Sequence, residues 1–512
     1  MLKRGSTYHK LCDDFAWSLP DRLNLAEQIV WNWAKRAPER PAILDVTSGE
    51  VQPVSYVDLA SITAALAGHL KANGIQKGDR VGVLRSQDRW CAAAHAAIWQ
   101  IGAISVPLFK LFREDALANR IHDAGCQMVI TDEEGASLLG ALAAPIIPER
   151  GLIGDPTADI AETGPETPAI LIYTSGTTGK PKGALHGHRI LTGHLPGVEM
   201  SHDFLGQQDD ILWTPADWAW IGGLFDVLMP GLALGVPVVA ARMPRFDVAA
   251  CVDFIRQTGI RNVFFPPTAL RMLKAEGAQI EGLRTVASGG EPLGAEMLAW
   301  GREALGVTIN EFYGQTECNM VASSCQTLFQ PRPGAIGRPV PGFDVQVIDA
   351  NRQPTADEGD IAVRKGPASM MLRYWNNPEA TAEKFRSDWM LTGDRGRMED
   401  GFVTFKGRED DVITSGGYRI GPAEIEDCLL THPEVATVGV VGKPDPLRTE
   451  IVKAYVVRKP GANVTEEDLQ AFVKSRLAAY SYPREITFLD SLPMTVTGKV
   501  IRKELKARAA KE

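Results

Sequence analysis

Helices and strands alternate between residues 56 and 131, and this alternation constrains the fold more than any other feature of the sequence. Apolar residues at helical spacing are followed each time by a short apolar run of the kind that forms a buried strand. The predicted helices and strands follow one another at residues 56–71, 80–84, 89–100, 103–107, 113–124 and 127–131. Strands that alternate with helices of this length are typical of a parallel sheet covered by helices. The sequence therefore predicts an α/β fold.

The pattern changes in the C-terminal third of the chain. Short apolar runs, such as 360–364 and 402–406, are separated by turn residues and predict a β-rich region. A charged stretch then marks a boundary, and a capping pattern at Thr465 opens a helix within a mixed α+β tail. We therefore expect an N-terminal domain of residues 1–409 and a C-terminal domain of residues 410–512.

Composition and charge narrow the class of protein. Of the 512 residues, 45% are hydrophobic and 23% charged, which is typical of a globular protein. A formal net charge of −9 argues against nucleic acid as the main partner. Seven scattered cysteines without a Cys-x-x-Cys pair predict neither a disulfide framework nor a zinc site, as expected for a cytoplasmic location. No apolar stretch is long enough to predict a membrane span.

A glycine-rich loop follows the apolar run 169–173. Its glycines let backbone N–H groups turn toward an anion, and its hydroxyls and lysines add donors and charge, so the loop suits a polyphosphate. It is not a Walker A loop, because Pro181 follows the first lysine where Ser or Thr is required. Taken alone, a solvated loop is an equally good interpretation. The candidate phosphate ligands are Thr174, Ser175, Gly176, Thr177, Thr178, Gly179, Lys180 and Lys182.

Five motifs occur in one order along the chain. They are the glycine-rich loop, the segment 311–317 (EFYGQTE), the segment 391–394 (LTGD), the segments 407–411 (GREDD) and 416–419 (GGYR), and the segment 493–499 (PMTVTGK). Together they resemble the adenylate-forming superfamily, and within it the medium-chain acyl-CoA synthetases. The resemblance implies a large N-terminal adenylate-forming domain, with parallel-sheet subdomains and a β-rich subdomain, followed by a small mobile C-terminal domain that hinges at Asp410.

The resemblance also implies an ATP-dependent carboxylate:CoA ligase. Such an enzyme forms an acyl-adenylate and pyrophosphate, and the CoA thiol then displaces AMP. Both steps build negative charge on oxygens, so fixed donors, cations and Mg²⁺ are expected to dominate over a covalent protein nucleophile. The implied cofactors and substrates are ATP, Mg²⁺, CoA and a small carboxylic acid.

Individual roles follow from the matched motifs. The resemblance makes Lys499 the lysine that contacts the reacting carboxylate and α-phosphate, makes Glu317 the Mg²⁺ ligand, and makes Thr174 a further catalytic residue. Without the family pattern, Lys499 would be interpreted as solvated surface. The nucleotide-binding set is completed by Gly289, Gly290, Glu291, Glu311, Phe312, Tyr313, Gly314, Gln315, Thr316, Asp394 and Arg408.

A second set of residues is implied for CoA. Glycines near the hinge would let the backbone approach the pantetheine arm, and basic residues would hold the CoA phosphates. A solvated basic face is the alternative, and Ser481 stands where many relatives carry Lys. The implied residues are Gly416, Gly417, Tyr418, Arg419, Arg448, Lys474 and Tyr482.

Gly314 is the residue that bears on the size of the substrate acid. Acetate-specific relatives carry a bulky Trp at this position, so a glycine predicts room for several methylenes and poor use of acetate. Trp218 and Gly222 fall where the family lines the acyl pocket, although tryptophans in this region, Trp213 and Trp220 among them, could equally fill the core. Acids of the 3-methylmercaptopropionate type and aromatic acids remain alternatives to medium-chain acids.

Other functions and partners stay open at this level. A stand-alone adenylation enzyme that loads a carrier protein shares the motifs, as does a nucleotide sensor, although the latter has no need of Lys499, Glu317 and Arg408 together. The context of Lys499 also resembles the target of lysine acetyltransferases, so such an enzyme and a deacetylase are candidate partners. An oligomer is compatible with the sequence.

Overall fold

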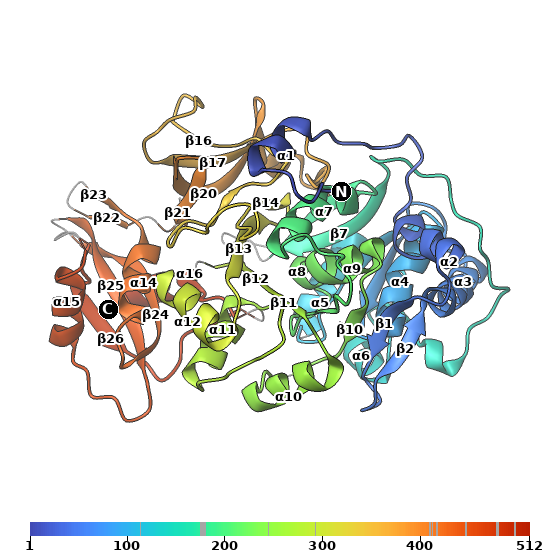
Figure 1. Cartoon of the computed structure of the whole chain (residues 1–512), viewed down its shortest axis with the longest axis horizontal. Helices are drawn as coiled ribbons and strands as arrows, with labels where there is room; N and C mark the ends of the chain where they lie inside the picture. The colour runs from blue at the N-terminus through green and yellow to red at the C-terminus, as the bar shows by residue number, and fades with distance from the viewer. Residues whose placement is uncertain are drawn as a thin grey trace.

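Two helix-covered sheets form the N-terminal part of the molecule in the computed structural model (Figure 1). The structure describes residues 1–112, 114–174, 181–243, 245–291, 293–408, 411, 413–415, 418–445, 448–477, 481–495 and 498–512. No helix in this described part of the chain combines the length and the apolar character that crossing a bilayer requires.

The larger sheet has nine strands, parallel at its centre and antiparallel at both edges. In spatial order they are β15 (Arg338–Pro339), β14 (Asn319–Ser323), β13 (Ile309–Gln315), β12 (Thr285–Gly289), β11 (Asn262–Phe264), β9 (Leu212–Trp213), β10 (Val238–Ala240), β1 (Pro41–Asp45) and β2 (Gln52–Ser55).

The second sheet has seven strands, of which five are parallel. In spatial order they are β18 (Arg373–Tyr374), β8 (Lys182–Gly187), β7 (Pro168–Thr174), β4 (Ile104–Pro107), β3 (Arg80–Leu84), β5 (Met128–Thr131) and β6 (Ala144–Ile146). Two parallel-centred sheets confirm the predicted α/β class.

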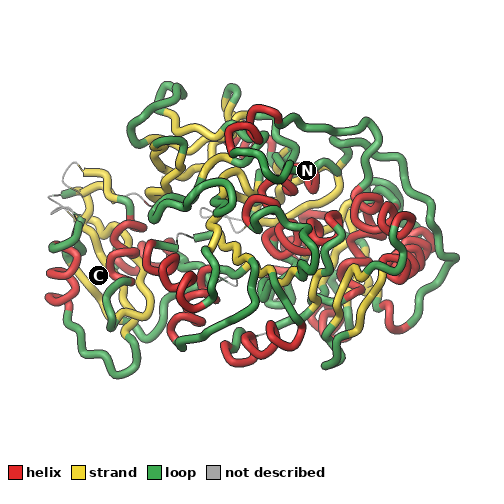
Figure 2. Tube along the Cα trace, in the orientation of Figure 1, coloured by secondary structure: helices red, strands yellow, loops and turns green. Residues whose placement is uncertain are grey.

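Helices cover both sheets (Figure 2). Those up to residue 201 are α1 (Tyr8–Asp14), the π-turn η1 (Glu27–Trp31), α2 (Asn32–Arg36), α3 (Tyr56–Ala72), α4 (Arg89–Gln100), α5 (Glu114–Ala124), α6 (Glu133–Leu139) and α7 (Ile190–Ser201). The later ones are α8 (Ile221–Gly223), the π-turn η3 (Leu224–Leu228), α9 (Met229–Leu234), α10 (Val248–Thr258), α11 (Pro267–Ala275), α12 (Ala295–Ala304) and α13 (Pro378–Lys384). The three helices and three strands expected between residues 56 and 131 are confirmed, with bounds that differ by one residue at most.

The main core lies where α4 is enclosed by its neighbours. Every residue from Cys91 to Gln100 is buried, and a helix that is apolar on all sides belongs inside a protein. Its alanines let α3 and β4 approach closely, while Trp99 donates its indole N–H to the Ala169 carbonyl oxygen at 2.8 Å. This core fixes the positions of the strands whose ends carry the candidate site.

The C-terminal third contains an antiparallel sheet and a small α+β unit, as the sequence predicts (Figure 1). The antiparallel sheet is made of β16 (Val345–Ile348), β17 (Gly359–Arg364), β19 (Phe385–Arg386), β20 (Trp389–Glu399) and β21 (Phe402–Arg408). The last unit contains β22 (Ile413–Ser415), β23 (Tyr418–Ile420), α14 (Pro422–Leu430), β24 (Val435–Asp445), β25 (Thr449–Arg458), α15 (Glu466–Lys474), β26 (Glu485–Phe488) and α16 (Arg502–Ala509). Helix α15 begins with the expected capping box, in which Thr465 and Asp468 exchange hydrogen bonds.

Candidate functional site

A tight turn near the C-terminus carries Lys499. The Lys499 backbone N–H donates to the Thr495 hydroxyl at 3.0 Å, and the Thr495 N–H donates back to the Lys499 carbonyl oxygen at 2.7 Å. Gly498 adopts φ +81°, a left-handed conformation that favours glycine. The Thr268 hydroxyl of α11 donates to the Gly498 carbonyl oxygen at 3.4 Å. The turn is therefore docked against the large N-terminal part of the molecule.

The side chain of Lys499 reaches the end of β12. A Cβ atom added to Gly290 would lie 3.6 Å from Lys499 Cε and 3.7 Å from Nζ. The same added atom would lie 3.9 Å from the ring edge of Trp220. Any side chain at position 290 would therefore compete with the lysine for space, and the absence of one lets the ammonium group enter.

The electrostatic setting of Lys499 is that of a desolvated cation. Burial lowers the pKa of its ammonium group, the charges of Glu291 and Asp394 partly restore it, and Arg408 lowers it further. Within the described residues no carboxylate forms an ion pair with the Lys499 ammonium group. A half-buried cation without an ion-pair partner favours an anionic ligand in the space beside it.

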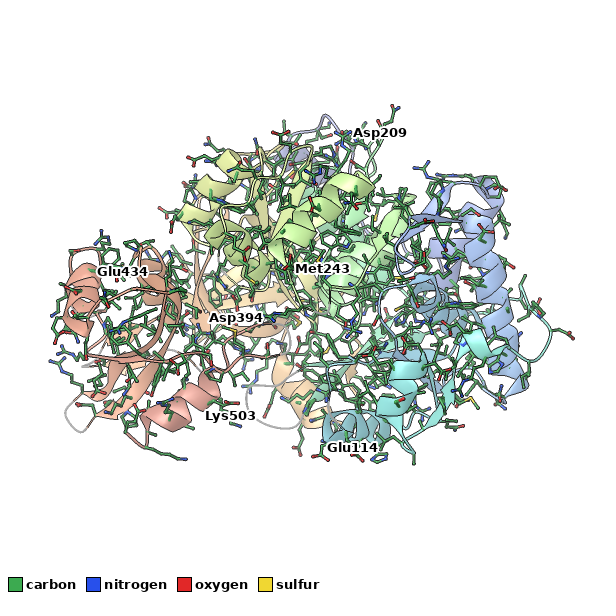
Figure 3. The ribbon with its side chains drawn as sticks, turned by 90° about the horizontal axis from the view of Figure 1, so that it is seen from below. Glu114, Asp209, Met243, Asp394, Glu434 and Lys503 are labelled. Atoms are coloured by element: carbon green, nitrogen blue, oxygen red, sulfur yellow. The ribbon has the colours of Figure 1, made fainter. Side chains whose placement is uncertain are left out.

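Asp394 is the centre of a hydrogen-bond network between β13, β20 and β21. Its Oδ2 atom accepts from the Tyr313 hydroxyl at 2.5 Å and from the Gln315 amide at 2.8 Å. Arg408, opposite Asp394 in the β20–β21 register, places Nε 3.8 Å from Oδ1. Burial raises the pKa of Asp394 while these partners lower it. Figure 3 shows Asp394 between the C-terminal unit, marked by Glu434 and Lys503, and the rest of the molecule.

Lys384 is a further member of this network. Its ammonium group donates to the Gln315 side-chain oxygen at 2.7 Å and to the Thr392 carbonyl oxygen at 3.3 Å. The Gln315 amide donates to that same carbonyl oxygen at 2.8 Å. Lys384 thus fixes which way the Gln315 amide points, and so helps to orient the Asp394 carboxylate.

Glu317 occupies the turn between β13 and β14, next to Thr316. Its carboxylate accepts a hydrogen bond from the Tyr374 hydroxyl, and its backbone oxygen accepts from the Met371 N–H at 2.7 Å. The described residues include no cluster of three or more His, Cys, Asp or Glu side chains that could hold a metal ion. Mg²⁺ is usually held by one or two carboxylates together with substrate phosphates, so a single Glu317 fits this ion when a nucleotide is present.

The phosphate-loop candidates are described only at the two ends of the loop. Thr174 ends β7, Lys182 begins β8, and the two are paired in register. The Lys182 ammonium group lies 5.5 Å from the centre of the Tyr374 ring, which joins this end of the loop to Glu317 through one tyrosine. The candidates Ser175, Gly176, Thr177, Thr178, Gly179 and Lys180 lie outside the described residues.

The ends of β12 and β13 are closely packed. A Cβ atom on Gly289 would lie 2.5 Å from the Phe312 ring, and Gly290 adopts φ +104°, so both positions require glycine. Glu311 accepts one hydrogen bond, from the Leu293 N–H at 3.3 Å, and burial raises its pKa to about 8. A carboxyl group in this setting holds its proton near neutral pH and can donate a hydrogen bond.

The CoA candidates lie in the C-terminal unit, away from Lys499. The Lys474 ammonium group sits 4.0 Å from the centre of the Tyr482 ring, and the Arg448 N–H donates to Asp445 at 2.8 Å. Helix α15, which ends at Lys474, lies on the side of this unit opposite β13 (Figure 1). The remaining candidates, which are Gly416, Gly417, the side chains of Tyr418 and Arg419, and the hinge residue Asp410, lie outside the described part of the chain.

The acyl-pocket candidates separate into different environments. Trp218 is fully buried in the main core. Gly222 packs against the Trp220 ring, and a Cβ atom added to Gly222 would lie 2.6 Å from that ring. A Cβ on Gly314 would lie only 1.8 Å from the Asn319 carbonyl oxygen. On the side where a side chain would stand, Gly314 is therefore packed against the backbone of the following turn, and room for a longer acyl chain stays a prediction.

Two contributors escaped the sequence analysis, and a third, Trp220, was left open between pocket lining and core filling. The Trp220 ring edge lies near Gly290, where Lys499 also ends. Tyr374 and Lys384 were not singled out, because they reach Glu317 and Gln315 across 57 and 69 residues of sequence. No local pattern marks a residue that acts through a contact of this kind.

Comparisons with known proteins agree with this geometry. The family described as "AMP-binding enzyme" matches residues 30–375, and "AMP-binding enzyme C-terminal domain" matches residues 424–499. The chain is similar to acetyl-coenzyme A synthetase of Bacillus subtilis, with 33% identity over 85% of this chain and 81% of that protein. It is also similar to mitochondrial acyl-coenzyme A synthetase ACSM3 of Mus musculus, with 30% identity over 98% of this chain and 93% of that protein.

Solved structures add information on the arrangement of the parts. ATP-bound MatB from Rhodopseudomonas palustris is similar with a TM-score of 0.85 and 26% identity, covering 95% of this chain and 99% of that one. The apo form of the same protein gives a TM-score of 0.76 and 27% identity over the same shares of the two chains. The chain therefore resembles the nucleotide-bound form of that protein more than its empty form.

Proposed function

The chain belongs to the AMP-binding enzyme family, and from this premise we propose that it joins a carboxylic acid of medium length to CoA through an acyl-adenylate, releasing AMP and pyrophosphate. The relatives are acyl-CoA synthetases that form AMP, and acyl-CoA synthetases of this family use ATP, Mg²⁺ and CoA. The observation that carries the proposal is the half-buried ammonium group of Lys499 beside Gly290, which has no ion-pair partner among the described residues.

In the first half-reaction we assign charge stabilisation to Lys499. Attack of a carboxylate on the α-phosphate builds negative charge on the phosphate oxygens, and a fixed, desolvated cation stabilises that charge more than it stabilises the ground state. Asp394 and Arg408, held by Tyr313 and Gln315, are proposed to bind the ribose. Glycines 289 and 290 and Glu291 are proposed to border the adenine.

Magnesium is proposed to bind between Glu317 and the phosphates of ATP. When bound, it would neutralise charge on the pyrophosphate leaving group. The protein's own contribution is to hold the Glu317 carboxylate through the Tyr374 hydroxyl and to place Thr316, Thr174 and the loop that follows Thr174 near the phosphates.

The second half-reaction is proposed to need a different arrangement of the two domains. In the described arrangement Lys499 is inserted, and helix α15, which ends at the CoA candidate Lys474, lies on the far side of the C-terminal unit, which supports assignment to the adenylation step. The greater similarity to ATP-bound MatB supports the same assignment. We propose that residues 410–512 turn about Asp410 relative to residues 1–409, withdrawing Lys499 and bringing the 416–419 segment toward the acyl-adenylate.

The proposed substrate is an acid larger than acetate. Trp218 and Gly222 are placed by the proposal in the wall of the acyl pocket, with Trp220 at its mouth beside Lys499. Aromatic or thioether acids, and transfer to a carrier protein instead of CoA, are the alternatives. A cytoplasmic location is proposed from the cysteine pattern, and a lysine acetyltransferase with its deacetylase is proposed to act on Lys499.

The test is pyrophosphate exchange into ATP over acids from C2 to C12, including branched, aromatic and thioether acids, with and without CoA. The proposal expects exchange with medium-length acids in the absence of CoA, and acyl-CoA formation once CoA is added. Exchange with no acid of the panel would refute the adenylation step. Exchange without acyl-CoA formation would refute CoA as the acceptor and favour a carrier protein.

A further inference from the structure

Asp226 and Asn319 form a polar pair inside an otherwise apolar region. Asn319 donates its amide N–H to Asp226 Oδ1, and the two residues are only 5% and 2% exposed, respectively. Asp226 lies in η3 between Phe225 and Val227, while Asn319 precedes Met320, and all three of these neighbours belong to the main core. Within the described residues, the second oxygen of Asp226 makes no hydrogen bond.

The position of the pair relates it to the candidate acyl pocket. Asp226 lies four residues after Gly222 on a continuous helical run, about one turn further along the same face. Gly222 contacts the Trp220 ring, whose edge lies near Gly290 and Lys499. The Trp220 ring thus approaches Gly290, where Lys499 also ends, and approaches Gly222, and Asp226 follows Gly222 about one turn along the helical run.

Asn319 reaches the same place from the opposite side. It begins β14 after the turn that contains Glu317, and its backbone fills the space next to the Cα of Gly314. The backbone of Asn319 adopts φ +48°, a left-handed conformation that asparagine tolerates better than most residues. The two glycines assigned to the acyl pocket, Gly222 and Gly314, are thus each adjacent to one member of the pair.

The pair is costly if it serves only to fill the core. Two buried polar side chains sharing one hydrogen bond leave donor and acceptor capacity unused, and such groups are destabilising in apolar surroundings. Replacing both partners by apolar groups of similar shape is often neutral or stabilising. Burial raises the pKa of Asp226 well above its ordinary value, because apolar surroundings penalise the charged carboxylate.

We propose that Asp226 and Asn319 form the far end of the acyl pocket and bind a hydroxyl group on the tail of the substrate acid. This rests on the proposed function as an acyl-CoA ligase and specifies its substrate class. A hydroxyl group has one proton to donate and can donate it to either of the two oxygens left without a partner, the second Asp226 oxygen or the Asn319 side-chain oxygen. An unsubstituted tail of the same length would leave both unsatisfied in contact with methylene groups.

The test compares pairs of acids of equal length, from C4 to C10, with and without a hydroxyl group on the last or penultimate carbon. The readout is kcat/KM for pyrophosphate exchange into ATP, which reports the first half-reaction alone. We expect the wild-type protein to favour the hydroxylated member of the best pair by at least about tenfold. A wild-type preference for the unsubstituted member at every length would overturn the inference.

Variants test whether Asp226 and Asn319 cause the preference for hydroxylated acids. Asp226→Leu should reduce the hydroxyl-to-unsubstituted ratio by about tenfold or more while exchange with unsubstituted acids persists. Asp226→Asn, which keeps the shape and hydrogen-bonding capacity, should retain most of the ratio, and it also serves if the leucine variant does not fold. Asp45→Asn alters a buried carboxylate bonded to Thr47 and Arg89 and should leave the ratio unchanged. An unchanged ratio in both Asp226→Leu and Asn319→Leu would overturn the inference.

These outcomes are separable from failure of the proposed function. If no acid of either series supports exchange, the adenylation activity itself is refuted and this inference falls with it. If unsubstituted acids support exchange as well as their hydroxylated counterparts do, the ligase function stands and only the role of Asp226 and Asn319 is refuted.

Discussion

Replacing Lys499 by alanine removes one unit charge from a desolvated position. With Nζ 3.7 Å from where a Gly290 Cβ would be, a phosphate oxygen in this space would lie about 4 Å from the ammonium group. At an effective dielectric constant of about 20, two unit charges at that distance interact by about 4 kcal/mol. This corresponds to about a thousandfold change in rate, which is in the range measured when other enzymes lose one charge-stabilising donor.

Lys499→Ala should therefore slow acyl-adenylate formation about a thousandfold. Thioester formation from a chemically prepared acyl-adenylate and CoA should change by no more than about threefold, because that step is proposed to occur with Lys499 withdrawn. The two assays are pyrophosphate exchange for the first half-reaction and CoA thiol consumption for the second. Lys503→Ala is the matched control, since this exposed lysine of α16 lies away from Asp394 (Figure 3).

Equal losses in the two half-reactions of Lys499→Ala would refute the argument, because they would indicate a general structural defect. A loss of adenylation as large in Lys503→Ala would refute it as well. In denaturant titration, the unfolding free energy of Lys503→Ala should stay within about 0.5 kcal/mol of the wild-type value. That of Lys499→Ala should be equal to the wild-type value or slightly higher, because a partly desolvated charge is removed.

Three further predictions follow from particular contacts. Burial lowers the pKa of Lys499, so its ammonium charge is lost as pH rises through that lowered value. The rate of adenylation should therefore decline at a lower alkaline pH than it would with an ordinary lysine. Lys499→Arg should be slower at neutral pH but should show no such decline, because a guanidinium group keeps its charge. Tyr374→Phe removes the hydroxyl that orients Glu317 and should raise the Mg²⁺ concentration for half-maximal exchange about tenfold, whereas an unchanged Mg²⁺ titration would contradict this role. Gly314→Ala places a Cβ against the Asn319 backbone and should lower the unfolding free energy by about 3 kcal/mol in denaturant titration, whereas a wild-type midpoint would show that this turn yields easily.

The local pattern of the sequence was enough to predict most of the fold. Helix α4 and its flanking strands were found because apolar periodicity and turn residues act over a few neighbours, which is the range that a sequence pattern samples. Separate parallel-sheet subdomains were implied by the family resemblance, but which strand belongs to which sheet was not predicted, since it depends on pairings such as that of β1 with β10, almost 200 residues apart. Long-range pairing leaves no local signature.

The candidate site was predictable only where a motif carries the residue. Lys499, Asp394 and Arg408 were singled out from motifs, and the structure brings their charges together. Gly314 illustrates the limit of such reasoning: its missing side chain predicts room for the substrate, but the sequence does not show that the Asn319 backbone packs against its Cα. Tertiary packing decides whether substrate or protein backbone lies next to a glycine, and the local sequence pattern does not predict that packing.

The insertion of Lys499 beside Gly290 has a consequence for labelling chemistry. An amine-directed reagent in bulk water reaches this half-buried lysine less readily than an exposed one, and more readily in molecules whose C-terminal unit has moved away. The extent of labelling at Lys499, relative to exposed lysines such as Lys503, would therefore measure how often an individual molecule leaves the described arrangement. Saturation with nucleotide should make that lysine one of the slowest in the chain to react.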